Sequence, residues 1–386
     1  MKIAYFTDTY APEVNGVTNT LSRLGKYLDE KQIKQLIFAP DYDEENIFCE
    51  SAYRTIHRFA GITSSLSPRS RLAFPPFWKI DEICDMYEPD IIHVTTELGI
   101  GFRGMRYALS RNIPLVMSFH TNFSKYLKYH NLEFVQPVLE NYLEWFHSFS
   151  ARTLVPSRHT LAELFQKGYR NLGLWSRGID RTSFNPGYRN EELRTKLGKD
   201  KFIFLYAGRL SAEKNLDMLL GAAGSIERRF PGMTTFIFTG DGPYAEKIQN
   251  KGIPNVVLTG FKKGKELSEI YASADCFTFP SATETFGNVV LEALSSGLPV
   301  VSVCGGGITD FLIHNYNSLL CDPEDTVLFT ENLVSVMQNK KLRSDLSINA
   351  LKTAMTRDWD NVFNCLVDVY HETIDTWLEQ NIRKTA

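Results

Sequence analysis

The stretch KFIFLYAGRLSAEKNLDMLL, residues 201–220, carries the pattern that decides the fold. An apolar run ends in a Gly-Arg turn, and the residues after it have apolar side chains at helical spacing. A strand followed directly by a helix is the repeating unit of parallel α/β sheets. The stretch therefore predicts one βα unit, with Arg209 and Lys214 where the strand gives way to the helix.

The same alternation of short apolar runs and amphipathic helical patterns recurs along the chain. Each half contains about five candidate strands, which are KIAYFT, KQLIFAP, DIIHVTT, IPLVMSF and ARTLVPS in the first half and KFIFLYAGRL, TTFIFTG, NVVLTGF, DCFTFP and LPVVSV in the second. The 386 residues are too many for one ordinary core, which stops growing at roughly 250–300 residues. We predict two Rossmann-like, doubly wound parallel-sheet domains that face a cleft. Ligands of such sheets bind beyond the carboxyl ends of the strands.

The domain boundaries follow from a polar stretch between the halves. We expect a first domain over residues 1–178, a linker over 179–200 and a second domain over 201–355. Residues 356–386 contain apolar positions at helical spacing, and we expect this C-terminal helix to pack back across the domains.

Composition excludes several classes of protein. A net charge of −3 offers no domain-wide basic excess for nucleic acid. Six cysteines without a CxxC pair favour a reducing compartment and argue against a zinc site. An acidic residue, Asp8, comes too early for a signal peptide, and no stretch approaches a membrane span. We therefore expect a cytoplasmic protein, with peripheral contact to a membrane left open.

Two glutamates lie in PSATETFGNVVLEALSSG, residues 280–297. Glu284 falls in a loop after a strand, and Glu292 falls in the first turns of the following helix. Two glutamates alone are more often solvated or ion-paired residues. The helix start offers free backbone N–H groups to hydroxyl or phosphate oxygens. Those donors are the amides of Phe286, Gly287, Asn288 and Val289.

Arg209 and Lys214 form a basic pair beside another helix start. Two cations there can hold a diphosphate and stabilise the charge that grows on it as it leaves. Two basic residues at a strand end are simply solvent-exposed about as often as they bind a ligand.

Further candidates lie at other strand ends. His120 follows IPLVMSF, although an isolated histidine is more often structural. Asn15 and Gly16 lie between the first strand and the first helix, where glycine allows close approach to a phosphate. Gly242 in GDGP and Phe261 in TGF lie in turns that can admit a base and a ribose, or are ordinary βα loops.

Three other patterns resemble ligand sites without their context. GIGFRG, residues 99–104, spells GxGxxG, but no acidic residue follows about 20 positions later to hold a ribose. Asp41-Tyr42-Asp43 and Asp358-Trp359-Asp360 spell DxD, and helix capping or loop solvation explains both. We expect no cofactor and no metal, because Arg209 and Lys214 serve the diphosphate.

Together these features resemble glycosyltransferase family 4, whose members are retaining enzymes of GT-B architecture, over nearly the whole chain. The E-x7-E pattern matches Glu284 and Glu292, and WSRGID and CGGGITDFL also fit. The resemblance implies that Glu284 and the amides after it contact the transferred sugar and that Glu292 holds the nucleotide ribose. It further implies that Arg209 and Lys214 neutralise the diphosphate and that His120 contacts the sugar in a front-side displacement. Asn15 and Asp310 depart from the commoner family residues.

Within the family, FTDTYAPEVNGVTNTL and SFHTNFSKYLKYH look closest to sulfoquinovosyl-diacylglycerol synthases and GDP-mannose-dependent mannosyltransferases. That resemblance implies a GDP-mannose or UDP-hexose donor and a lipid, lipid-linked or glycan acceptor. RSRLAFPPFWK (residues 69–79) and KYLKYH (residues 125–130) interleave aromatic and basic residues, as a membrane surface or a partly buried loop does. Alternative functions are a nucleotide-sugar epimerase, a phosphorylase and a non-catalytic sugar-nucleotide-binding protein.

Overall fold

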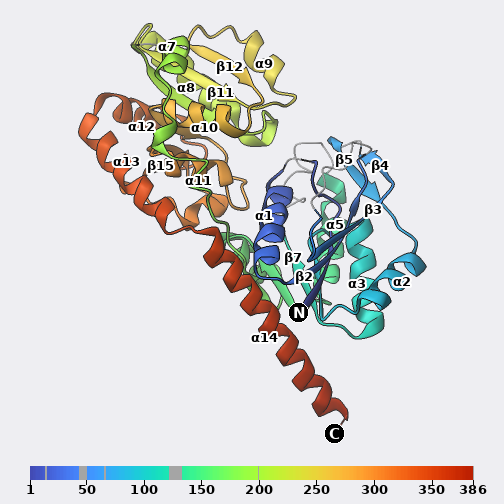
Figure 1. Cartoon of the computed structure of the whole chain (residues 1–386). Helices are drawn as coiled ribbons and strands as arrows, with labels where there is room; N and C mark the ends of the chain where they lie inside the picture. The colour runs from blue at the N-terminus through green and yellow to red at the C-terminus, as the bar shows by residue number, and fades with distance from the viewer. Residues whose placement is uncertain (14, 43–49, 65–66, 121–132, 199, 386) are drawn as a thin grey trace. The chain divides into compact units, whose positions relative to one another are not determined.

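The computed structural model describes residues 1–13, 15–42, 50–64, 67–120, 133–198 and 200–385. The chain divides into two compact units, and the colour bar of Figure 1 lets their residues be followed by number. The first unit comprises Met1–Ser176 together with Asp360–Ala386, and the second comprises Arg177–Trp359. Each unit contains one parallel sheet with helices packed on it, so the predicted fold class is confirmed.

The first unit is built on a seven-stranded parallel sheet with the order β3-β2-β1-β6-β7-β8-β9. A separate antiparallel hairpin, β4-β5, follows β3. The strands are β1 (Lys2–Phe6), β2 (Lys34–Pro40), β3 (Arg54–Phe59), β4 (Gly61–Ser64), β5 (Ser67–Ala73), β6 (Ile91–Val94), β7 (Leu115–Ser118), β8 (Arg152–Val155) and β9 (Leu172–Leu174). The helices are α1 (Gly16–Glu30), α2 (Phe77–Tyr87), α3 (Gly99–Arg111), α5 (Gln136–His147), α6 (Arg158–Gln166) and α14 (Trp359–Thr385), with a short 3-10 turn η2 (Glu133–Val135).

The second unit has a six-stranded parallel sheet with the order β12-β11-β10-β13-β14-β15. Its strands are β10 (Phe202–Ala207), β11 (Thr234–Thr239), β12 (Val256–Gly260), β13 (Cys276–Phe279), β14 (Val300–Val303) and β15 (Ser318–Cys321). Its helices are α7 (Glu191–Gly198), α8 (Leu216–Arg229), α9 (Ala245–Asn250), α10 (Gly264–Ser273), α11 (Asn288–Ser295), α12 (Thr326–Gln338) and α13 (Lys340–Met355). Its 3-10 turns are η3 (Pro186–Tyr188), η4 (Ala212–Lys214) and η5 (Gly306–Asp310).

All the strands expected from apolar runs are present, and the structure adds the hairpin β4-β5 and, in the two parallel sheets, β3, β9 and β15. These three lie at the edges of the sheets, so one side of each has no neighbouring strand. β3 (RTIHRF) mixes charged with apolar residues, and β9 and β15 are only three and four residues long. Edge strands need less apolar surface than central strands, so a search for runs of apolar residues does not predict them.

The polar stretch before the second sheet contains a helix that its composition does not indicate. Helix α7 packs Leu193 and Leu197 against the core of the second unit. Two leucines four positions apart lie on one face of a helix. Arg194 of the same helix also pairs with Asp275 at 2.9 Å, which fixes it to the second unit.

The GIGFRG string has a packing role. It forms the first half of α3, and a Cβ added at Gly101 would overlap the carbonyl oxygen of Thr96. A Cβ added at Gly104 would overlap the ring of Phe6 in β1. The glycines therefore let this helix approach the sheet closely.

Helix α14 returns the end of the chain to the first unit. The Tyr370 hydroxyl is buried and lies 3.0 Å from the Tyr5 hydroxyl and 2.6 Å from Nδ1 of His93. Trp377 donates a hydrogen bond from Nε1 to the carbonyl oxygen of Asn112, at 3.1 Å. Within the described part of the chain, no helix is long and apolar enough to cross a membrane.

Candidate active site

Two glycine turns meet at the carboxyl edge of the second sheet. Gly208 follows β10 with φ of 147°, and Gly240 follows β11 with the same φ. A Cβ added at Gly240 would overlap the carbonyl oxygen of Gly208, and one added at Gly242 would overlap that of Leu210. The amide of Leu210 donates to the carbonyl oxygen of Asp241 at 2.8 Å. The predicted GDGP turn is thus in backbone contact with the loop that carries Arg209.

The basic pair occupies this same loop and the turn after it. Arg209 is 58% exposed, and its Nε lies 3.8 Å from Oε1 of Glu213. Lys214 ends η4 and is buried, with its side chain only 8% exposed. The Lys214 ammonium donates to Oε1 of Glu284, which follows β13. Residues 70 positions apart in sequence are therefore joined as an ion pair at the sheet edge.

The loop that carries Glu284 rests on a run of glycines. The amide of Gly307 donates to the carbonyl oxygen of Glu284 at 2.7 Å. A Cβ added at Gly306 would overlap that oxygen, and one added at Gly307 would overlap the carbonyl oxygen of Thr285. The CGGG string of residues 304–307 thus packs directly against the backbone of the loop that carries Glu284.

Helix α11 begins at Asn288 without a side-chain cap. Gly287 precedes it with φ of 91°, a conformation that favours glycine. Oδ1 of Asn288 is buried and accepts no hydrogen bond from a described residue. Within the described ranges, the first amides of this helix also have no acceptor, namely those of Phe286, Gly287, Asn288 and Val289. An open helix start attracts anionic or hydroxyl oxygens.

Glu292 lies one turn into α11 and is held by a tyrosine. The hydroxyl of Tyr271 lies 3.0 Å from Oε2 of Glu292 and 3.2 Å from the carbonyl oxygen of Val289. Burial, followed by the charge of Glu292, raises the pKa of Tyr271 well above its ordinary value. The phenol therefore stays protonated and donates its hydrogen.

Tyr206 connects the basic loop to the acidic side chains. Its hydroxyl donates to the carbonyl oxygen of Arg209 at 2.9 Å. Burial, then the charges of Glu284 and Glu213, raise the pKa of Tyr206 well above its ordinary value. Tyr206 is thus bonded to the loop of Arg209 and lies within the electrostatic influence of Glu284, which itself pairs with Lys214.

Sequence reasoning passed over Tyr206, Tyr271 and Glu213. Glu213 is buried and accepts from the Ser211 hydroxyl at 2.5 Å, so it holds the basic turn from within. Both tyrosines lie inside apolar patterns, where an aromatic residue is expected in a core. The only sequence feature that could have indicated one of these three residues is that Glu213 directly precedes the predicted Lys214.

The remaining predicted residues belong to other elements of the chain. Phe261 follows β12 and is 48% exposed. His120, Asn15 and Gly16 belong to the first unit, where the His120 ring lies 5.5 Å from that of Trp175. Oδ1 of Asn15 accepts from the amides of Val17 and Thr18 and caps α1. The KYLKYH string lies outside the described residues.

Comparison with known proteins shows the family of the chain. A family model described as Glycosyltransferase Family 4 matches residues 14–183, and one described as Glycosyl transferases group 1 matches residues 189–353. An alpha-monoglucosyldiacylglycerol synthase of Streptococcus pneumoniae is 30% identical over 319 residues, which cover 78% of the chain and 71% of that protein. The chain belongs to glycosyltransferase family 4. The resemblance inferred from the E-x7-E pattern and the basic pair is confirmed.

Other relatives of this family 4 glycosyltransferase fall in the predicted branch. A GDP-mannose-dependent alpha-mannosyltransferase of Mycobacterium tuberculosis is 29% identical over 374 residues, covering 96% of each chain. A sulfoquinovosyl transferase of Arabidopsis thaliana is 33% identical over 284 residues, covering 71% of this chain and 54% of the plant protein.

Solved structures agree on the GT-B fold. Sucrose-phosphate synthase of Thermosynechococcus elongatus superposes with a TM-score of 0.79 at 18% identity, covering 97% of this chain and 99% of that one. The HepE protein of Anabaena in complex with UDP gives a TM-score of 0.76 at 19% identity, covering 96% and 100%.

Proposed function

We propose that this family 4 glycosyltransferase is a retaining, metal-independent hexosyltransferase that uses GDP-mannose or a UDP-hexose. Its acceptor is a lipid, a lipid-linked sugar or a glycan, and it acts at the cytoplasmic face of a membrane. The single observation that carries the proposal is the Lys214–Glu284 ion pair beside the open start of α11. A buried cation, a carboxylate and unused amides together match a diphosphate joined to a sugar.

Each group in the cluster has a role in this reaction. Arg209, which is more than half exposed, and Lys214 neutralise the diphosphate as the bond to the sugar breaks. Binding of the donor breaks the ion pair between Lys214 and Glu284. The Glu284 carboxylate then accepts hydrogen bonds from the sugar hydroxyls. The free amides at the start of α11 donate to the sugar or phosphate oxygens. Glu292, oriented by Tyr271, accepts from ribose hydroxyls.

Retention follows if the leaving phosphate oxygen deprotonates the acceptor on the same face of the sugar. That route needs no dedicated base and no metal, because the basic pair carries the developing charge. His120, Asn15 and Gly16 contribute sugar contacts from the first unit. The side chain of Asn15 is committed to its cap, so its contribution is to place the exposed Gly16 backbone.

A lipid acceptor is supported by a surface of the first unit. Phe74 and Trp78 are 59% and 67% exposed. The guanidinium carbons of Arg103 and Arg106 lie 3.6 Å and 4.4 Å from the centre of the Phe77 ring. Exposed aromatics beside cations suit the interface of an anionic bilayer. The names of the relatives cited above include enzymes of glycolipids.

A thermal-shift panel tests the donor first. GDP, UDP and ADP, each with its sugar nucleotides, are added to the purified chain, and the matching nucleotide raises the unfolding midpoint because it binds only the folded state. Transfer is then measured to lipid acceptors in vesicles, with and without EDTA, and the anomeric configuration of the product is read by NMR. An inverted product or loss of transfer in EDTA contradicts the mechanism. An epimerised donor, or binding without transfer or donor hydrolysis, contradicts the activity itself.

A further inference from the structure

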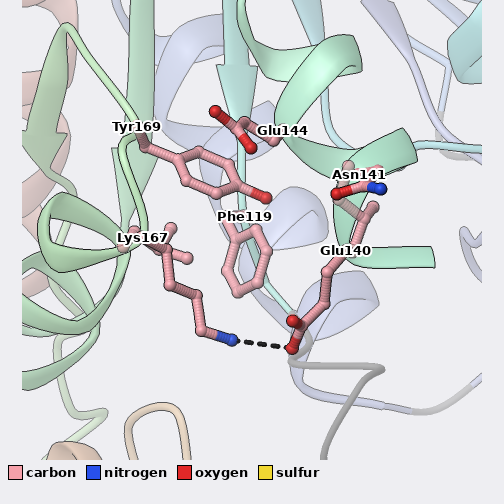
Figure 2. Close-up of a pocket in the computed structure, with 8 residues that line it drawn as sticks. Phe119, Glu140, Asn141, Glu144, Lys167 and Tyr169 are labelled. Carbon is pink, nitrogen blue, oxygen red and sulfur yellow. Dashed lines mark hydrogen bonds and ion pairs between the residues drawn. The ribbon is translucent and has the colours of Figure 1, made fainter. Parts of the chain in front are cut away.

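The first unit contains a pocket between α5 and α6 that the proposed reaction does not use. Figure 2 shows its lining side chains, which enclose a cavity of about 150 Å³. Its floor includes Phe119, the residue after β7, and its walls come from the two helices. The lining residues are Phe119, Glu140, Asn141, Leu143, Glu144, Leu164, Lys167 and Tyr169.

One tyrosine in this pocket is buried as a residue, and its hydroxyl oxygen has no hydrogen-bond partner among the described residues. Tyr169 is 6% exposed, and its ring packs against those of Phe119 and His147. Figure 2 shows its hydroxyl pointing into the pocket. That hydroxyl forms no hydrogen bond with any residue in the described ranges. Burial raises the pKa of Tyr169, so the hydroxyl remains a donor.

Two further polar side chains at the rim are also uncommitted. Among the described residues, the Glu144 carboxylate has neither an ion pair nor a hydrogen bond, and the same holds for the Asn141 amide. Glu140 differs, because it accepts from Nζ of Lys167 at 2.8 Å. The pocket therefore presents one carboxylate acceptor, one phenol donor and one amide that can do both.

This combination distinguishes between classes of ligand. An anion meets the unpaired charge of Glu144, and a simple cation leaves the donors of Tyr169 and Asn141 without acceptors. A hydroxyl group both donates and accepts, so several hydroxyls on one ligand satisfy the whole set. The apolar floor of Phe119 and Leu164 suits the C–H face of a ring, and a cavity of this size holds a six-membered ring.

We propose that this pocket binds a neutral polyhydroxy ring, a pyranose or a cyclitol, that belongs to the acceptor. This assignment of the acceptor rests on the proposed function, whereas the affinity of the pocket for the ring does not. Binding of the ring selects acceptors that carry a sugar or cyclitol head group.

Saturation-transfer NMR on the full chain tests the pocket without requiring turnover. The probes are methyl α-mannopyranoside and myo-inositol, with choline as a cation of similar size. We expect transfer to at least one of the two rings and none to choline. Loss of a hydrogen bond to a charged or buried group weakens binding about tenfold, so Glu144→Ala and Tyr169→Phe each reduce the signal strongly.

Matched variants separate pocket effects from loss of folding. Asn141→Ala lies on an exposed helix surface and lowers the ring signal, whereas Glu82→Ala, an exposed glutamate of α2, leaves it unchanged. The nucleotide-induced thermal shift stays at the wild-type value in all four variants. Unchanged ring binding in the three pocket variants, or binding of choline alone, overturns the proposal. Ring binding without any nucleotide shift leaves the pocket standing and contradicts the proposed function instead.

Discussion

Helices α1 and α3 of the first unit begin differently from helix α11 of the second. In the first unit, Asn15 caps α1 through two amides, and Asp8 accepts from the amide of Ile100 at the start of α3 at 2.7 Å. Asp8 is buried, and this burial raises the pKa of its carboxyl group. In the second unit, α11 has no side-chain cap, and Gly287 precedes it.

The difference teaches where a ligand is expected. At a capped helix start, the first backbone N–H groups already donate to a side chain of the protein. At an uncapped start, the same N–H groups can donate to the oxygens of a ligand. The acidic and basic side chains follow the same division, because Lys214 and Glu284 meet beside the open helix. We therefore assign donor chemistry to the second unit and acceptor selection to the first.

The largest expected effect comes from removing the charged pair. Glu284→Ala or Lys214→Ala lowers sugar transfer by about 100- to 1000-fold, the loss typical of a group that stabilises developing charge. Steady-state transfer with saturating donor measures it, and circular dichroism checks the fold. Lys265→Ala, which breaks an exposed ion pair with Glu269 on α10, is the matched control and keeps near-normal turnover. Near-normal turnover in Glu284→Ala sinks the assignment.

The glycine support behind the glutamate loop gives the next effect. Gly306→Ala places a Cβ against the carbonyl oxygen of Glu284 at φ of 65°, which displaces the loop. We expect transfer to fall about tenfold and the free energy of unfolding to fall by about 1–3 kcal/mol. Gly232→Ala is the control, because its φ is also positive, at 72°, but nothing lies within 4 Å of an added Cβ. Equal losses of activity in the two variants would contradict the proposal that Gly306 supports the loop of Glu284.

A smaller effect is expected where one side chain orients another. Tyr271→Phe removes the hydrogen bond to Glu292 and raises the KM for the sugar nucleotide by about three- to tenfold, with kcat nearly unchanged. Tyr244→Phe, whose hydroxyl contacts Asp217, serves as the control. A fall in kcat at constant KM means that Tyr271 does not act through ribose binding.

The smallest effect tests the closed helix start. Asn15→Ala removes the cap of α1 and costs about 1 kcal/mol of the free energy of unfolding, as measured by urea denaturation. We expect the thermal shift induced by the nucleotide to stay unchanged, because we propose that the donor binds at the open start of α11 in the other unit. Loss of that shift with stability retained contradicts the division between the two helix starts.

Central strands and strand-end charges were readable from sequence. Runs such as Phe202–Ala207 are apolar throughout because both faces of a parallel sheet are covered. The spacing of Glu284 and Glu292, one in the loop after a strand and one in the first turns of the next helix, predicted a site. Local order along the chain is sufficient for such features.

Other features depend on residues that meet only in the folded chain. Three contacts join segments that are distant in the sequence. They are the ion pair of Lys214 with Glu284, the close approach of Gly306 to the Glu284 carbonyl oxygen, and the hydrogen bond from Tyr271 to Glu292. The pocket around Tyr169 likewise draws on β7, α5 and α6. The sequence alone determined which residues carry charge at the strand ends. Tertiary structure decided which of those charges are buried, paired or left open, because burial and partners are set by segments that the chain brings together only when it folds.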